Sequence, residues 1–242
     1  SPENESQNQT KPVEKARLPR SSFFQELASV IFGKDYSSVT PEEYDTITAL
    51  EINKEERFIY YLLKDQEEYQ SLTFSNAVGM ELSDLACFTG LESIWLDDDL
   101  TWGDLDGLEH LQWIYAENNL SDFLKIIPNP ENILSLRITD SIFEHSLDGI
   151  EAFTNLQYLT VEYDSLDDIS ALESLPLLEG LSLLGCDDLT DYSPLLSLGW
   201  LRSLSLQSSQ LKSIDFINSM PDLTSLYVED SQISNVNALA NC

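Results

Sequence analysis

This 242-residue chain is poor in the residues that most chemical sites need: it has 12 lysines and arginines, three cysteines and two histidines. Against those 12 basic residues stand 43 acidic ones, so the formal net charge at neutral pH is −31. A surface this acidic repels nucleic-acid phosphates and anionic membrane lipids, although it also favours solubility. The composition therefore excludes nucleic acid as a partner. A basic protein, a cationic peptide, a metal ion or a neutral glycan stays open.

The three cysteines are Cys87, Cys186 and Cys242, and they are too few and too widely spaced for a disulfide framework or a zinc site. We interpret Cys186 and Cys242 as small buried hydrophobic residues. No apolar stretch approaches the ~18 residues of a membrane-spanning helix, so we expect no membrane insertion by this segment. The sequence predicts no cofactor and no bound metal.

Candidates for catalysis are equally scarce. His110 and His145 have no serine, cysteine or acid that the sequence pattern would bring beside them, and we interpret both as surface residues. No glycine-rich phosphate loop and no nucleophile elbow is found. The acidic runs at 97–99 and 187–188 lack the spacing and the turn glycine of an EF-hand loop. The sequence therefore predicts a protein that is not an enzyme.

What the chain does contain is a six-residue pattern, apolar-x-x-apolar-x-apolar, which returns nine times at steps of 20 to 23 residues. The pattern begins at Ile47, Tyr69, Leu91, Leu111, Ile133, Leu156, Leu178, Leu201 and Leu223. A fixed period of this length indicates a solenoid, in which each unit buries its apolar face against its neighbours.

Within each repeat the apolar spacing changes from two to three. The period of two predicts a strand, and the period of three after it predicts a 3₁₀ or short helical return. The repeat from Leu156 shows this return clearly, with Leu166, Ile169, Leu172 and Leu175. We expect the equivalent strand residues Leu181 and Leu204 to lie in the buried core.

These repeats resemble the leucine-rich repeat family in its 22-residue form, and most of all the bacterial surface proteins of the internalin type. The resemblance covers residues 22–242, although the family's asparagine at the ninth repeat position is kept only at Asn119. It implies a right-handed α/β solenoid with a parallel sheet on the concave face and short helices on the convex face. It also implies a non-catalytic binding module.

The chain divides into three parts. Residues 1–21 have the polar composition of a linker, and we expect them to be disordered. Residues 22–46 form the predicted N-terminal helical cap, with a helix from about Phe23 to Phe32. Residues 47–242 form the predicted array of about nine repeats.

Two capping boxes are predicted in the N-terminal cap, one from Ser22 to Gln25 and one from Thr40 to Glu43. No comparable cap is visible at the C-terminal end. Either the array continues beyond residue 242, or the strand from Leu223 leaves an edge that associates with another chain.

The predicted binding surface is the concave face. Strand side chains alternate, so the third, fifth and seventh repeat positions point away from the core. Aromatic residues gather at these positions in the third to sixth repeats, with acidic residues beside them, as is typical of interaction sites. The predicted ligand-binding residues are Trp95, Asp97, Trp113, Tyr115, Glu117, Arg137, Tyr158 and Glu162. Such a surface suits a basic protein segment or a sugar stacked on a ring; alternatively, the rings only pack along the sheet.

The function predicted first is a secreted or cell-surface module that binds a protein, peptide or glycan ligand, with a lipid anchor upstream of residue 1 as one means of attachment. An intracellular scaffold or inhibitor is the alternative. A glycan-active enzyme is the remote alternative, because Asp97 and Glu117 would lie ~4.8 Å apart on neighbouring strands. That separation is close to the ~5–5.5 Å of retaining glycosidases, but repetition alone produces it.

Overall fold

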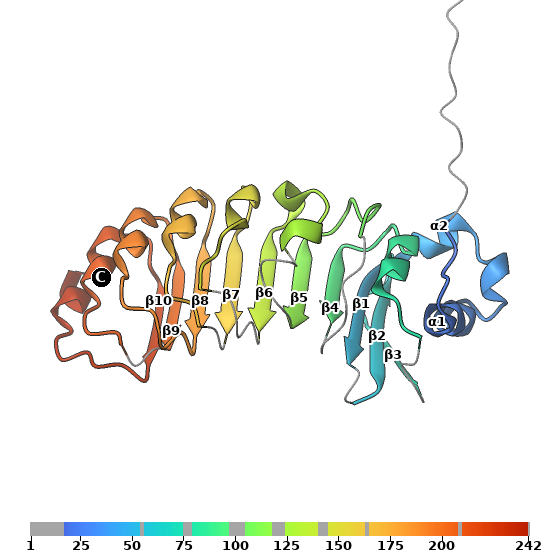
Figure 1. Cartoon of the computed structure of the whole chain (residues 1–242), viewed down its shortest axis with the longest axis horizontal. Coiled ribbons are helices and arrows are strands. Elements are labelled where there is room, and N and C mark those ends of the chain that lie inside the picture. Colours follow the sequence, from blue (N-terminus) through green and yellow to red (C-terminus); the bar gives the residue numbers. More distant parts are fainter. Residues whose placement is uncertain are drawn as a thin grey trace, which may run out of the picture.

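The computed structural model describes residues 17–53, 56–74, 79–96, 105–117, 124–139, 145–162, 165–207 and 210–241. Ten strands form one sheet, in the order β10-β9-β8-β7-β6-β5-β4-β1-β2-β3, which runs along the molecule (Figure 1). The strands are β1 Ile47–Asn53, β2 Phe58–Leu63, β3 Gln70–Thr73, β4 Ser93–Leu96, β5 Trp113–Glu117, β6 Ser135–Thr139, β7 Tyr158–Glu162, β8 Gly180–Leu184, β9 Ser203–Gln207 and β10 Ser225–Glu229.

A parallel array forms most of this sheet. β1 pairs with β4, and each strand from β4 to β10 pairs in parallel with the next. Short 3₁₀ helices return the chain between strands: η2 Leu82–Cys87, η3 Pro130–Asn132, η4 Ile150–Ala152, η5 Ser170–Ser174, η6 Ser193–Ser197 and η7 Asp215–Ser219. A further one, η8 Asn237–Asn241, follows the last strand, β10. The fold is a right-handed leucine-rich repeat solenoid, as the repeats predict.

Equivalent positions of successive repeats stack into one core. Leu159, Leu181 and Leu204 occupy the same position on β7, β8 and β9, and each is at most 2% exposed. Cys186 is also fully buried, as expected. At the end of the array the equivalent residue Leu226 on β10 is only half-buried, because β9 covers it from one side.

One of the nine predicted repeats is wrong. The segment from Tyr69 matches the pattern, but β3 pairs antiparallel with β2, and β2 pairs antiparallel with β1. The parallel array therefore passes directly from β1 to β4. The connections explain this difference: only residues 54–57 separate β1 from β2, whereas a parallel crossover needs about a dozen residues or more.

Helix α1, Ser22–Phe32, covers the N-terminal end of the core with Phe23, Phe24 and Leu27 and ends at Gly33, whose φ is +63°. The predicted capping box at its start is wrong. Ser21 is the N-cap residue, and its hydroxyl donates a 2.7 Å hydrogen bond to the Asp84 carboxylate instead of capping the helix.

Asp84 fixes the segment that precedes α1. Its carboxylate is buried and also accepts hydrogen bonds from the backbone N–H groups of Arg20 and Ser21, at 2.7 to 3.0 Å. Most of the expected disordered linker, residues 1–16, lies outside the described residues. The last two residues of the expected linker, Arg20 and Ser21, are instead held in place by their hydrogen bonds to Asp84.

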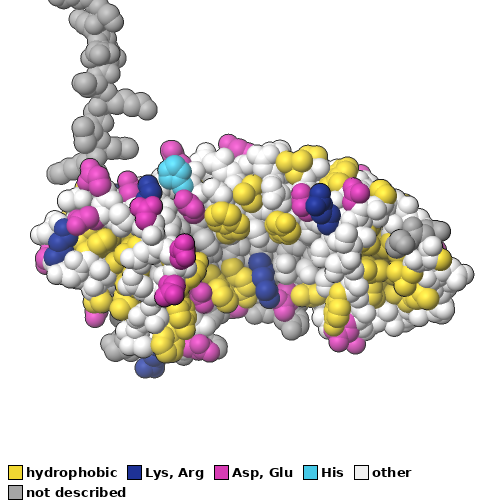
Figure 2. All heavy atoms as spheres, turned by 180° about the vertical axis from the view of Figure 1, so that it is seen from behind, with side chains coloured by type: hydrophobic (Ala, Val, Ile, Leu, Met, Phe, Trp, Pro, Cys, Tyr) yellow, Lys and Arg dark blue, Asp and Glu magenta, His cyan; other side chains and the backbone are white. Residues whose placement is uncertain are grey.

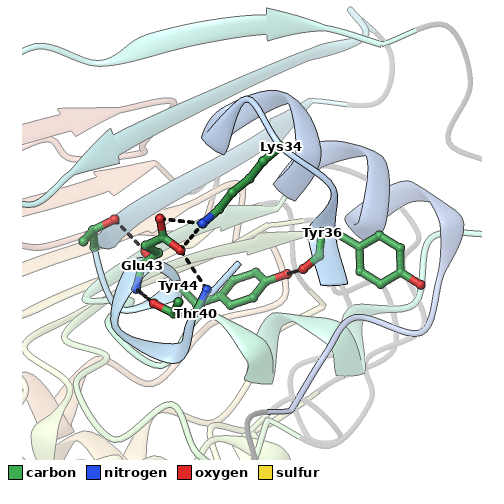
Figure 3. Close-up of polar contacts among 6 residues, drawn as sticks. Lys34, Tyr36, Thr40, Glu43 and Tyr44 are labelled. Atoms are coloured by element: carbon green, nitrogen blue, oxygen red, sulfur yellow. Dashed lines mark hydrogen bonds and ion pairs between the residues drawn. The ribbon is translucent and has the colours of Figure 1, made fainter. Parts of the chain in front are cut away.

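The second helix of the cap, α2 at Pro41–Tyr44, has the capping box that the sequence predicts. Thr40 Oγ1 accepts from the Glu43 N–H, and Glu43 accepts from the Thr40 N–H at 2.8 Å. Figure 3 shows that Glu43 also accepts from the ammonium of Lys34, while the Tyr44 hydroxyl donates to the carbonyl oxygen of Tyr36. These bonds connect α2 to the segment that follows α1.

Candidate functional site

The sheet has one face packed on the core and one face turned outwards, which we call the concave face. Seven of the eight predicted ligand-binding residues lie on its strands β4 to β7, and Asp97 lies outside the described residues. We call these seven the concave patch: Trp95, Trp113, Tyr115, Glu117, Arg137, Tyr158 and Glu162. The parallel register places them in three rows across the sheet.

The row at the fifth repeat position contains Trp95, Tyr115 and Arg137, and these side chains form a connected chain of contacts that ends at Glu162. The rings of Trp95 and Tyr115 pack at 4.6 Å between centroids, inclined by 57°. The Arg137 guanidinium lies 5.0 Å from the centre of the Tyr115 ring, a cation–π contact. Its Nη2 also donates a 2.8 Å hydrogen bond to Glu162 Oε2 on β7. The four side chains therefore hold one another in position before any ligand arrives.

In the row at the third repeat position, two large rings are open to solvent. Trp113 is 42% exposed and Tyr158 is 50% exposed, and the small side chain of Ser135 separates them in the register. Tyr158 leans over the neighbouring strand, because a Cβ added at Gly180 would lie only 2.7 Å from its ring. The glycine at position 180 thus provides the room in which the Tyr158 ring lies.

The row at the seventh repeat position contains Glu117, Thr139 and Glu162. Thr139 is the buried member of this row. Burial raises the pKa of the neighbouring Tyr115 phenol, while the nearby Thr139 hydroxyl and the Arg137 charge lower it in part. The Tyr115 phenol is therefore neutral at physiological pH, and the charges of the patch are those of its carboxylates and Arg137.

Several aromatic residues of the same face were missed by the sequence analysis, because the strand β2 was not recognised. Ile59 and Tyr61 of β2 are buried, so Phe58 and Tyr60 point to the opposite, concave side. Their rings stack at 6.1 Å. The continuous run of apolar and aromatic residues at 58–63 was the available signal, but it falls between repeats of the 22-residue period.

Figure 2 shows one broad side of the molecule, on which groups of hydrophobic side chains lie among acidic ones and basic side chains are isolated. Among the described residues, no group of three histidine, cysteine or acidic side chains could hold a metal ion. No helix in the described part of the chain is long and apolar enough to cross a membrane.

Cys87 and His145 are the remaining candidates for a chemical role, and the surroundings of both are those of structural residues. Burial, and after it the charge of Asp84, raises the pKa of the Cys87 thiol to about 12, so the reactive thiolate is not formed near neutral pH. His145 does have an acid partner, contrary to expectation: its Nδ1 lies 3.4 Å from Asp167 Oδ2, because a bridge between residues 146 and 168 brings two repeats together. Both side chains are more than half exposed, so this is a contact at the surface.

Comparisons with known proteins agree with this fold. Residues 200–241 match a family described as leucine-rich repeats in two copies. No curated protein sequence matches the chain. Among solved structures, internalin C2 from Listeria monocytogenes covers 91% of this chain and 89% of its own, with a TM-score of 0.65 at 21% identity.

A second internalin of Listeria monocytogenes, InlF, covers 91% of this chain and 72% of its own, with a TM-score of 0.53 at 18% identity. This chain thus has the fold of a leucine-rich repeat protein. Its fold is similar to that of the internalins.

Proposed function

We propose that this protein is a non-catalytic module that binds a protein or peptide partner through the concave patch. The observation that carries the proposal is the pair of exposed rings, Trp113 and Tyr158, beside side chains that already hold one another in place. Tryptophan, tyrosine and arginine are the residues that contribute most to binding at protein interfaces. Side chains that are ordered before binding lose less conformational entropy when a partner arrives.

We further propose that the module acts outside the cell, either secreted or held at the cell surface. The resemblance to internalin-type surface proteins supports this location. An intracellular scaffold or inhibitor with the same fold is the alternative, and fractionation of the source cells separates the two.

Selection from a random peptide display library against the folded protein tests the proposed surface. The selected peptides should bind Trp113→Ala and Tyr158→Ser at least roughly tenfold more weakly than the parent, as expected for residues that dominate an interface. Tyr227→Ser on β10 is the matched control, because Tyr227 is 53% exposed and lies on the same face. The affinity of the selected peptides for this control variant should equal their affinity for the parent.

A further variant displaces a ring without removing it. Gly180→Ala would place a methyl group against the Tyr158 ring and should weaken the same peptides, although Tyr158 is still present. If the peptides bind Trp113→Ala and Tyr158→Ser as they bind the parent, the concave patch is not the binding site. If the protein selects no peptide but binds a neutral oligosaccharide on a glycan array, the ligand is a glycan.

Association through the edge strand β10 stays a prediction. Light scattering across a concentration series should show a mass that rises with concentration if Leu226 and its neighbours pair with another chain. A constant monomer mass would contradict this prediction.

A further inference from the structure

The antiparallel strands β2 and β3 extend the concave face beyond the repeats. In this extension Glu51 of β1 lies directly opposite Tyr60 of β2 on one side and Trp95 of β4 on the other. Side chains that are directly opposite on neighbouring strands have Cβ atoms about 4.5–5.5 Å apart. One carboxylate is therefore flanked by two aromatic rings in a single row of the sheet.

A third ring belongs to the same place. Tyr69 precedes β3 and is 53% exposed. Tyr69 lies two residues before Ser71, which is opposite Tyr60 in the register, so the alternation of side chains places the Tyr69 ring on the same face. Burial, and after it the negative charge of Glu51, also raises the pKa of the Tyr69 phenol. The Trp95 ring is 41% exposed, and Tyr60 and Glu51 are half-buried, so the group is accessible from outside.

We propose that Glu51, Tyr60, Tyr69 and Trp95 form a site for the cationic end of a lysine or arginine side chain of the protein partner. The proposal rests on the proposed function, since it assigns one contact of the same partner. Aromatic faces attract a cation through their quadrupoles, and a carboxylate among them adds direct charge attraction. We call these four residues the cation site.

The surrounding charge favours this occupant over an anion. The net charge of −31 attracts a basic segment at long range. Arg137, the basic residue of the concave patch, lies on β6, three strands and roughly 14 Å from β1. Its guanidinium is already engaged by Glu162 and the Tyr115 ring, so it opposes a cation at Glu51 only weakly.

Peptide probes test the cation site without knowledge of the partner. Hexalysine and hexaarginine are titrated into the parent protein by calorimetry at 150 mM salt, with hexalysine acetylated on every side chain as the neutral control. Glu51→Gln keeps the shape of the side chain and removes its charge, and Tyr60→Leu removes a ring. Glu229→Gln is the matched control, since Glu229 is an acid on the same face beside a single ring, Tyr227, which donates to it.

We expect Glu51→Gln and Tyr60→Leu to weaken binding of the cationic peptides roughly tenfold, and Glu229→Gln to change it less than twofold. Equal losses in Glu51→Gln and Glu229→Gln would mean diffuse attraction by the acidic surface and would overturn the proposal. Failure of the parent to bind either cationic peptide, or equal binding of the acetylated peptide, would overturn it as well. If the Tyr60→Leu variant does not fold, the isosteric variant Glu51→Gln still tests the cation site.

Competition with choline distinguishes a quaternary ammonium ligand from a lysine or arginine side chain. If choline displaces hexalysine at a lower concentration than lysine amide does, the site takes a quaternary ammonium and the assignment to lysine or arginine is overturned. Peptides selected by display separate this proposal from the proposed function. Loss of their binding in Trp113→Ala, with no change in Glu51→Gln, overturns the cation site alone.

Discussion

Arg137 on β6 donates a 2.8 Å hydrogen bond to Glu162 on β7, which is not the residue directly opposite it in the register. The opposite residue is Thr160, so the guanidinium reaches diagonally across the sheet. This direction keeps Arg137 over the Tyr115 ring and leaves the Trp113 and Tyr158 rings uncovered. The ion pair thus connects β6 and β7 on the concave face.

The first prediction concerns this ion pair. Glu162→Gln should lower the free energy of unfolding by about 1 kcal/mol or less. The Glu162 side chain is only 16% exposed, but its partner Arg137 is 47% exposed, and pairs open to solvent contribute little. Selected peptides should nevertheless bind this variant more weakly, since Arg137 loses its orientation. Glu179→Gln, which removes the longer 3.7 Å pair with Arg202, is the control in urea melts and binding assays. A Glu162→Gln loss of several kcal/mol with unchanged binding would show a structural role instead.

The second prediction compares equivalent leucines. Leu181→Ala should cost about 2–5 kcal/mol, the usual range for truncation of a fully buried leucine. Leu226→Ala should cost roughly half of that or less, because Leu226 is only half-buried at the end of the array. Urea denaturation of the two variants measures the difference. Equal losses would mean that β10 is covered in solution by something that the described residues do not include.

The third prediction concerns Asp84. Asp84→Ala should destabilise the protein by about 1–3 kcal/mol, since it leaves the buried donors of Ser21 without an acceptor. Asp222→Ala, at an exposed turn, is the control and should change stability little. Hydrogen exchange should become faster at the start of α1 in Asp84→Ala. Unchanged exchange there would show that Asp84 does not fix the entry to the helix.

The fourth prediction is a pH dependence. The hydrogen bond from Lys34, and after it the one from the Thr40 N–H, holds the pKa of Glu43 below its ordinary value of 4.5. A lowered folded-state pKa means that the stabilisation is complete above pH 4.5 and is lost as the pH falls through the lowered value. The parent should therefore be more stable than Glu43→Gln at pH 7, and the gap should close on acidification. A gap that stays constant down to pH 2 would contradict this origin.

The fifth prediction concerns Cys87. Its thiol is buried, and burial raises its pKa to about 12, so alkylating reagents should not label it in the folded protein at pH 8. Labelling followed by peptide mass spectrometry should detect modified Cys87 only after denaturation. Rapid labelling of the native protein would mean that the 3₁₀ helix η2 opens readily.

The amino-acid sequence alone predicts the repeating core. Each period of about 22 residues places leucines such as Leu181 and Leu204 at the same point of the coil, and stacking is the simplest way to bury them all. It also determined the α2 cap, because the Thr40–Glu43 capping box is a local contact between residues three apart. The same register placed seven described residues of the predicted site on one face.

The direction of the strands at the N-terminal end follows from the tertiary structure and not from the sequence pattern. The apolar pattern at Tyr69 reads the same for a parallel and an antiparallel strand, since side-chain alternation carries no direction. The short connection after β1 forces the chain to turn back, and this brings Tyr60 opposite Glu51. The tertiary structure also decided which acid Arg137 contacts: its guanidinium lies over the Tyr115 ring of one neighbouring strand and donates to Glu162 of the other.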